Sequence, residues 1–494
     1  MASAFFNVAD YQAIKPEILL TLFGLAVLLF DYLLDKRDKY LNAVLTLIGL
    51  GFALLQLGIF WFRHFSRGGT AYLGFDGSFA FDSFAVVAQT LIVVATAIVV
   101  LISVKYLDIE EVNQGEYYAL LLFAAVGMMF MVAGKDLIVL FVALEVMALC
   151  EYVLAGFLRG NRRSNEAAVK FFLLGAFSSG LLLYGMSLLY GIGGSTKLAV
   201  IAERLRDRPA SDPISWIALI TLLAGMYFKI AAVPFHQWTP DTYEGAPTSI
   251  TAFISVAPKV ASFGFIIRIL FMGLWPLRLE WQALTIGVAI ATMTLGNLAA
   301  ITQDNIKRFF GYSAIAHVGY LLLGLVAAAD GDVTGLRAIV IYLIVYAFMN
   351  LGAFAVIIMM RRKDVIGDEI SDLSGLMSRA PGLALLMLVF LLSLAGIPPT
   401  AGFIGKYFIF LSLVETGHYY LAVLGVVYSV VALYYYFRIV VVMFMKKSLD
   451  EIPYATSLGL SVALGATAAV TLLIGIYPQP IIDIAREAIR PFLS

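Results

Sequence analysis

The fold is decided by the segment Lys229-Ile-Ala-Ala-Val-Pro-Phe-His-Gln-Trp-Thr-Pro-Asp-Thr-Tyr-Glu-Gly-Ala-Pro247, in which three prolines interrupt an apolar run. Proline lacks a backbone donor and clashes with the preceding turn, so we expect a helix to break here. A second segment of this kind, Leu394-Ala-Gly-Ile-Pro-Pro-Thr-Ala-Gly-Phe-Ile-Gly-Lys406, lies in the later half. Interrupted helices at corresponding positions in two halves indicate a transporter built from inverted repeats.

The rest of the chain is apolar enough to lie in a membrane. Of its 494 residues, 62% are hydrophobic and 13% are charged, whereas a soluble domain is about 25% charged. The apolar runs are about 18 to 25 residues long, the length of a helix that spans a hydrocarbon core. The expected spans are about 17–34, 41–62, 82–105, 117–133, 137–158, 167–191, 214–233, 248–272, 283–303, 308–328, 335–360, 382–415 (interrupted), 419–445 and 455–478. We therefore expect an all-α polytopic membrane protein of about 14 transmembrane helices.

Two of the loops are expected to have structure of their own. Alternating apolar residues around the Asp76-Gly77 pair predict a short surface β-hairpin in 69–82. The stretch from Thr196 to Arg208 has its apolar residues on one face, which predicts an amphipathic surface helix. Lysine and arginine are more frequent in the loops after odd-numbered spans. The positive-inside rule then predicts that both termini lie on the non-cytoplasmic side.

Several classes of function are excluded by composition. The net charge is zero, so nothing indicates nucleic-acid binding. The single cysteine, Cys150, excludes an internal disulfide and a cysteine-based cluster or zinc site. The four histidines are dispersed, and no glycine-rich nucleotide motif follows a predicted strand. We expect no cofactor in this chain.

The most informative ionisable residues inside the apolar runs are Glu145, Lys229, Lys259, His317 and Lys406. A lysine at the centre of a membrane helix costs about 2.5 to 3.5 kcal/mol to insert and marks an ion path or proton relay by default. The alternative for each lysine is a structural pairing between helices. Two kinked helices would explain the prolines, but not the lysine beside each break.

The sequence also suggests a partner or an alternative role for several of these residues and their neighbours. Glu145 is the natural partner of Lys229, because an unpaired buried carboxylate is costly. Glu151 points about 120° away on the same helix and is a lesser candidate, expected to face a neighbouring subunit. His317 suits proton relay because imidazole titrates near neutral pH, although a single mid-helix histidine also fits a satisfied core position. The run 434–436 with Arg438 fits either a polar lining or an interfacial aromatic belt.

These motifs resemble a known family, the antiporter-like membrane subunits of respiratory complex I and of multisubunit cation/proton antiporters. The resemblance rests on Phe141-Val-Ala-Leu-Glu145, the string from Lys229 to Asp241, Lys259, Tyr312-Ser-Ala-Ile-Ala-His317 and the string from Ala395 to Lys406, and it extends over essentially the whole chain. A lysine at 406, where another group has glutamate, and Asp241-Thr-Tyr243 in place of Asp-Ala-His favour one particular group of complex I subunits.

The resemblance implies an architecture and a function. Two inverted five-helix repeats, 117–272 and 283–445, are expected between an N-terminal three-helix region, 1–116, and a C-terminal helix in 446–494. The implied function is proton translocation coupled to quinone reduction in other subunits of the bacterial inner membrane or an equivalent membrane. The expected partners are other membrane-arm subunits, including antiporter-like ones, and the lipid bilayer; flavin mononucleotide, iron–sulfur clusters and quinone are expected in the partner subunits.

Two other assignments use the same residues: a subunit of a multisubunit sodium/proton antiporter and a subunit of a related membrane-bound redox complex. A membrane scaffold without transport leaves the buried lysines unexplained. Our hypothesis is a lateral hydrated relay from Lys229 and Lys259 to His317 and Lys406. Moving Glu145 relative to Lys229 would load or unload a proton, since a charge pair at 4 Å interacts by about 4 kcal/mol and a charge crossing 100 mV costs about 2.3 kcal/mol.

Overall fold

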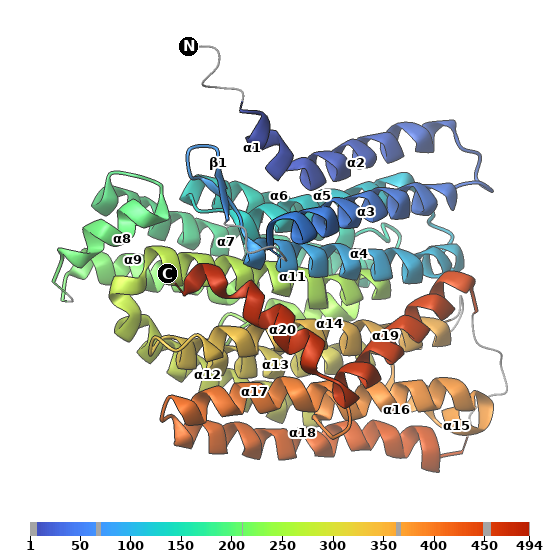
Figure 1. The fold of residues 1–494 in the computed structure, drawn as a ribbon. Coiled ribbons are helices and arrows are strands. Elements are labelled where there is room, and N and C mark those ends of the chain that lie inside the picture. The colour runs from blue at the N-terminus through green and yellow to red at the C-terminus, as the bar shows by residue number, and fades with distance from the viewer. Residues whose placement is uncertain (1–6, 66–70, 210, 362–366, 448–455, 494) are drawn as a thin grey trace.

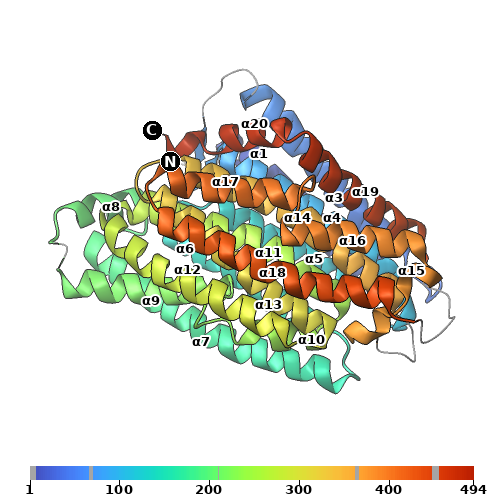
Figure 2. The same cartoon turned by 90° about the horizontal axis from the view of Figure 1, so that it is seen from below.

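The protein is a bundle of long, roughly parallel helices. The computed structural model describes residues 7–65, 71–209, 211–361, 367–447 and 456–493. Most helix axes are aligned across Figure 1, with α2 and α3 along the top and α16 to α18 along the bottom. The view from below shows α7 and α9 on one side of the bundle and α19 with α3 on the other (Figure 2).

The N-terminal region contains three long helices and a hairpin. Its elements are α1 Val8–Ala13, α2 Lys15–Leu33, α3 Leu41–Phe60, the π-helical turn η2 Trp61–Phe65, β1 Tyr72–Gly74, β2 Phe79–Phe81 and α4 Ser83–Ile109. Asp82 begins α4, because its side chain accepts a hydrogen bond from the backbone of Ala85 at 2.9 Å.

The remaining elements are given in the order of the two predicted repeats, a division that stays a prediction. The first half contains α5 Gly115–Ala133, α6 Leu137–Ala155, α7 Arg162–Gly193, α8 Leu198–Arg206, α9 Pro213–Lys229, α10 Trp238–Gly245, α11 Thr248–Arg268, η3 Ile269–Gly273 and η4 Trp275–Leu277. The second contains α12 Arg278–Ile301, α13 Ile306–Ala328, α14 Thr334–Met360, η5 Ile370–Leu373, α15 Leu376–Arg379, α16 Pro381–Ala395, α17 Ala401–Glu415 and α18 Tyr419–Met445. The chain continues through α19 Leu458–Ile476, α20 Gln479–Ala488 and η6 Arg490–Phe492. The inverted relation between the halves stays a prediction.

Within the described residues, 12 helices are long and apolar enough to cross a membrane. The two other expected spans correspond to the shorter α9 and to the broken pair α16 and α17. The all-α membrane architecture is therefore confirmed, whereas the count of about 14 is not. Both interruptions are confirmed: α9 ends at Lys229 before α10 begins, and α16 ends at Ala395 before α17 begins.

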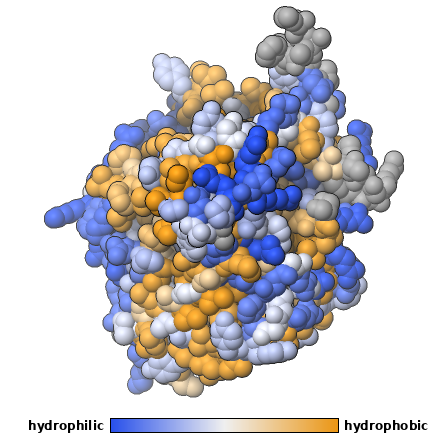
Figure 3. Space-filling model, turned by 90° about the vertical axis from the view of Figure 1, so that its left-hand side faces the viewer, coloured by the Kyte–Doolittle hydropathy of each residue, from blue (hydrophilic) through white to orange (hydrophobic). Residues whose placement is uncertain are grey.

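The hairpin and the amphipathic helix pack together at one end of the bundle. Strands β1 and β2 pair antiparallel, with β1 partly exposed and β2 buried against the helices. Lys197, just before α8, forms an ion pair with Asp76 in the hairpin turn at 2.5 Å, and this contact lowers the pKa of Asp76. Figure 3 faces this end, where hydrophilic residues gather among apolar ones. Residues 69 and 70 of the expected hairpin lie outside the described ones.

Both ends of the described chain reach this same end of the bundle. Helix α1 packs beside β1, and Phe492 of η6 stacks edge-on against Phe84 at the start of α4, with ring centroids 5.2 Å apart. The expectation that the termini share one side fits this arrangement, and the side itself stays a prediction.

Three helices form the centre of the bundle. In α11 every side chain is buried, and α13 and α14 are buried over nearly their whole length. Their sequences are apolar on all faces, as expected for helices surrounded by protein. Lys259 and His317 are the exceptions that matter, because they place ionisable groups on the two most enclosed helices.

A buried ion pair joins α4 to the end of α11. Arg268 donates to both carboxylate oxygens of Asp82 at 2.7 Å, and its Nε donates to the carbonyl of Val132 at 2.9 Å. Both charged side chains are almost fully enclosed. The rings of Phe84 and Phe492 cover the guanidinium at 5.2 and 5.6 Å. The pair therefore links the start of α4, the end of α11 and the C-terminal segment.

Candidate functional site

The first break is closed by contacts that replace the lost helical hydrogen bonds. The indole of Trp238 donates to the carbonyl of Phe228, in the last turn of α9, at 2.9 Å. The backbone N–H of Val233 donates to the Thr292 hydroxyl of α12 at 3.0 Å. Irregular backbone at membrane depth thus finds partners within the protein, as it must away from water.

The second break is closed in a similar way. Gly396 ends α16 with a φ of 87°, a conformation that favours glycine. The Ser393 hydroxyl accepts a hydrogen bond from the backbone of Gly402 at 2.9 Å, which joins the end of α16 to the start of α17. Lys406 lies in the second turn of α17, whereas Lys229 is the last residue of α9. The two lysines therefore occupy opposite sides of their breaks.

Lys229, the last residue of α9, lies against side chains of α6. Its Nζ donates to the hydroxyl of Tyr152 at 3.3 Å and interacts electrostatically with Glu145 and Glu151. Glu145 is half-buried and accepts a hydrogen bond from the Ser179 hydroxyl at 2.5 Å. Among the described ion pairs, none joins Glu145 directly to Lys229. The structure therefore places Glu145 near Lys229 as a second charge, held by Ser179, and not in a contact pair.

Lys259 and His317 lie at the centre of the bundle. Lys259 is 3% exposed, donates to the carbonyl of Ala314 at 3.2 Å and lies over the ring of Tyr346 at 5.3 Å. His317 is equally buried; its Nδ1 lies 2.7 Å from the Tyr342 hydroxyl and its Nε2 lies 3.1 Å from that of Tyr436. Both ring nitrogens are therefore hydrogen-bonded.

Lys406 is a buried lysine of the second half. Its Nζ donates to the carbonyl of Ala395 at 2.8 Å, the last residue before the break, and lies 4.9 Å from the centre of the Tyr320 ring. His317 interacts electrostatically with both Lys406 and Lys259. The structure thus brings together Lys259, His317 and Lys406 across the two halves, and groups Lys229 with Glu145.

Gly396 fixes the position of Lys406. A Cβ at residue 396 would lie 2.8 Å from Cδ of Lys406, and the positive φ adds strain. In Gly396→Ala we expect the Lys406 side chain to move from the Ala395 carbonyl, with a loss of stability of about 1 to 2 kcal/mol from the backbone. Proton uptake by vesicles containing the assembled complex, with thermal unfolding of the same sample, measures both effects.

The matched control is Gly382→Ala in α16, where an added Cβ meets nothing within 4 Å. This variant should retain both wild-type stability and wild-type proton uptake. Equal proton uptake in Gly396→Ala and Gly382→Ala would contradict a role for Gly396 in placing Lys406.

The sequence did not reveal the polar side chains that contact these buried ionisable residues. Of the tyrosine run, Tyr434 is exposed while Tyr435 and Tyr436 are buried, so the polar-lining interpretation holds for the latter two. Tyr436 contacts His317 and also Ser313, at 2.6 Å. The sequence shows only that three tyrosines are consecutive. Which of them face the interior depends on how the helix packs against its neighbours.

The expectation that Glu151 faces a neighbouring subunit is wrong. Its side chain is 3% exposed and is enclosed within this chain. The angular separation from Glu145 was no guide, because α6 packs against both α5 and α7 and so has more than one inward face.

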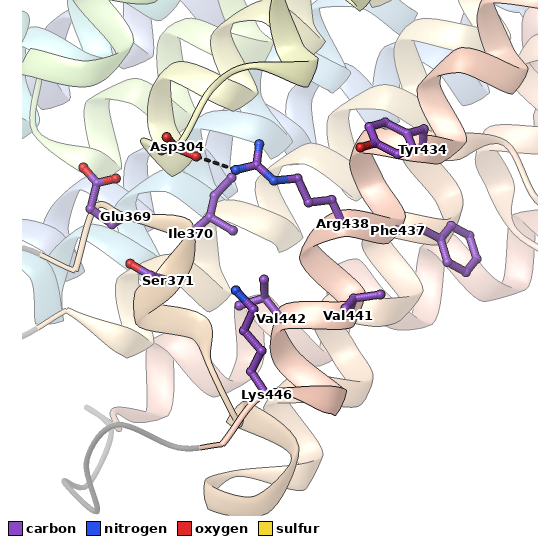
Figure 4. A pocket seen from close by; sticks show the side chains of 10 residues that line it. All are labelled: Asp304, Glu369, Ile370, Ser371, Tyr434, Phe437, Arg438, Val441, Val442 and Lys446. Atoms are coloured by element: carbon purple, nitrogen blue, oxygen red, sulfur yellow. Dashed lines mark hydrogen bonds and ion pairs between the residues drawn. The ribbon is translucent and has the colours of Figure 1, made fainter.

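Arg438 does not contact Lys259, His317 or Lys406 among its described hydrogen bonds and ion pairs. It lies in a pocket of about 500 Å³ at one end of the bundle. It pairs with Asp304 and donates to the carbonyls of Ile301 and Gln303 at 3.0 and 2.9 Å. In Figure 4 its guanidinium points toward Asp304, while Phe437 turns away. Arg438 therefore binds the C-terminal end of α12, and its contacts give it no part in the relay.

The geometry agrees with comparisons to known proteins. Residues 134–432 match the family described as NADH:quinone oxidoreductase/Mrp antiporter, TM. NADH-quinone oxidoreductase subunit N 2 of Solibacter usitatus is 51% identical to this chain over 492 residues, 99% of each sequence. The chain belongs to the NADH-quinone oxidoreductase subunit N family.

A further relative and a solved structure support the assignment. NADH-quinone oxidoreductase subunit N 1 of Koribacter versatilis is 52% identical over 95% of this chain and 94% of its own. A chain in the structure of respiratory complex I from Thermus thermophilus with bound aureothin is 32% identical, with a TM-score of 0.79, covering 95% of this chain and 98% of that one. The group of complex I subunits favoured by Lys406 and by the 241–243 string is subunit N, so that prediction is confirmed.

Proposed function

We propose that this chain is a proton-translocating membrane-arm subunit of a complex I-type NADH:quinone oxidoreductase. The observation that carries the proposal is the burial of Lys229, Lys259, His317 and Lys406 inside a bundle that contains two broken helices. Ionisable groups enclosed in a membrane bundle mark ion paths and proton relays. The similarity to NADH-quinone oxidoreductase subunit N supports a redox-driven complex over a sodium/proton antiporter.

Each residue has a role that follows from its contacts. The Lys229 ammonium is stabilised by the Glu145 carboxylate, which Ser179 orients. His317 accepts a proton on one ring nitrogen and releases one from the other, because each nitrogen has its own tyrosine partner. Lys259 and Lys406 both interact electrostatically with this histidine. In the proposed relay each of these amines takes up and releases a proton.

The remainder of the proposal concerns the assembly. The subunit works beside other antiporter-like membrane-arm subunits in the bacterial inner membrane or an equivalent membrane, with both termini on the non-cytoplasmic side. Flavin mononucleotide, iron–sulfur clusters and quinone belong to partner subunits. The regions 117–272 and 283–445 act as the two half-channels, flanked by 1–116 and 446–494.

The test is a mild-detergent pull-down of the tagged chain, followed by mass spectrometry, cofactor absorbance and an NADH oxidation assay. Flavin and iron–sulfur subunits with NADH:quinone activity are the expected result. Membrane partners alone, with sodium-dependent proton flux, would replace the proposal with the antiporter assignment. Redox subunits without NADH activity would replace it with a related membrane-bound redox complex.

A further inference from the structure

Glu151 is a second carboxylate near Lys229, and the proposed relay assigns it no role. It interacts electrostatically with Lys229, and its neighbour Tyr152 receives the Lys229 hydrogen bond. One of its oxygens is buried and has no hydrogen-bond partner among the described residues. A buried carboxylate without hydrogen-bond partners is costly. Buried polar groups with a structural role are normally hydrogen-bonded.

A comparison with the other enclosed glutamate shows what is unusual. Glu17 in α2 is just as buried and also has one oxygen, Oε2, without a hydrogen-bond partner among the described residues. Its Oε1, however, accepts a hydrogen bond from Gln89 at 2.7 Å, and Gln89 also donates to the carbonyl of Met129. Glu17 thus has a fixed neutral partner. Glu151 instead has a base whose charge can change. Glu145 differs again, because the Ser179 hydroxyl fixes its orientation.

Helix α10 supplies a polar route from Glu151 toward one end of the bundle. The hydroxyls of Thr239, Thr242 and Tyr243 are buried and have no hydrogen-bond partner in the described part of the chain. Tyr243 lies in electrostatic range of Glu151. Buried groups of this kind are the usual partners of internal water.

The outer part of the same helix is charged and half-exposed. Asp241 and Glu244 both pair with Arg308 of α13, at 2.6 and 3.1 Å, and Asp241 also pairs with Lys170 of α7 at 2.8 Å. Polar groups therefore continue along α10 from this charged cluster to the enclosed hydroxyls, and from Tyr243 to Glu151.

We propose that Glu151 carries protons between the α10 end of the bundle and Lys229. A proton from the aqueous phase is relayed along water held by the α10 hydroxyls to the Glu151 carboxylate, which becomes a neutral acid while the relaying water stays neutral. The O–H bond of this acid then breaks as an N–H bond forms on the neutral Lys229 amine, directly or through one water, leaving a carboxylate and an ammonium. Glu145 stabilises the ammonium without exchanging the proton. This role rests on the proposed proton-translocating function.

The experiment compares Glu151→Gln with the matched control Glu17→Gln, each in the full chain assembled in its complex. Glutamine keeps the shape of the side chain but does not carry a proton. We expect NADH-driven proton uptake by vesicles to fall about tenfold in Glu151→Gln, less than the 10²- to 10⁴-fold of a sole proton-transfer group, because Glu145 still attracts protons to Lys229. Glu17→Gln should pump like the wild type, and Glu151→Asp should recover part of the rate.

A second readout separates proton transfer from structure. Infrared difference spectra taken during turnover should contain a carboxyl protonation band that disappears in Glu151→Gln and persists in Glu17→Gln. Wild-type pumping and an unchanged band in Glu151→Gln would overturn the inference. Thr242→Val and Tyr243→Phe, which remove only hydroxyls, should each slow pumping severalfold; no effect of either would overturn the route along α10 even if Glu151→Gln did not assemble.

Failure of this inference is distinguishable from failure of the proposed function. If Lys229→Ala stops proton uptake and Glu151→Gln does not, only the role of Glu151 is wrong. If neither variant changes proton uptake, the relay itself is wrong.

Discussion

In the Lys229→Ala variant, proton transfer through this chain is expected to slow by about 10²-fold or more, the contribution of a positioned proton-transfer group. The change removes an amine that interacts with both Glu145 and Glu151. The measurement is the number of protons taken up by vesicles for each NADH oxidised by the assembled complex. An unchanged stoichiometry would contradict the relay.

Two companion variants show what kind of loss has occurred. Lys229→Arg keeps a positive charge, but arginine does not release its proton in proteins. If Lys229 only balanced charge, the arginine variant would pump normally; we expect it to fail like the alanine variant. Lys105→Ala is the control for the substitution, because Lys105 forms an exposed pair with Asp108 on α4 and should be replaceable without effect.

The parts of the fold that follow from local chemistry could be predicted from the sequence. Proline acts on its own turn, so both breaks were expected where α9 and α16 end. An apolar run long enough to span a membrane is also a local property, and it located the long helices. The count of spans is harder, because α9 and α16 stop short at their breaks and length alone no longer decides.

The candidate site was predictable only in its charged members. A lysine in an apolar run is visible in the sequence, and Lys229, Lys259 and Lys406 were found by that signal. Their neighbours depend on how distant helices pack: Tyr436 reaches His317 across 119 positions of sequence, and Ser179 reaches Glu145 from the next helix. No periodicity within one helix contains that information.

The ion pair of Asp82 and Arg268 was missed for the same reason, since 186 positions separate its members. Each residue lies near the end of an apolar run, where a charge usually reaches water and needs no partner. Packing instead encloses both, with the rings of Phe84 and Phe492 over the guanidinium. A charged residue at a helix end is therefore weak evidence of exposure in a bundle whose C-terminal segment folds back over it.

In Asp82→Ala, the stability of the bundle is expected to fall by about 3 to 5 kcal/mol, the usual effect of removing one partner from a buried pair. The loss arises because Arg268 remains enclosed without a counter-charge, and the capping bond to Ala85 disappears as well. Thermal unfolding of the purified complex in detergent, followed by loss of the size-exclusion peak, measures the change.

A double variant tests this reason for the loss. Asp82→Ala combined with Arg268→Met removes both charges and leaves an apolar side chain of similar length, so it should recover most of the stability, because replacing a whole buried pair by apolar groups is often neutral. Asp108→Ala, which breaks only the exposed pair with Lys105, should change the stability by less than about 1 kcal/mol. If the double variant were as unstable as Asp82→Ala, the unpaired charge would not be the cause, and the lost cap and the packing around Phe84 and Phe492 would have to account for the effect.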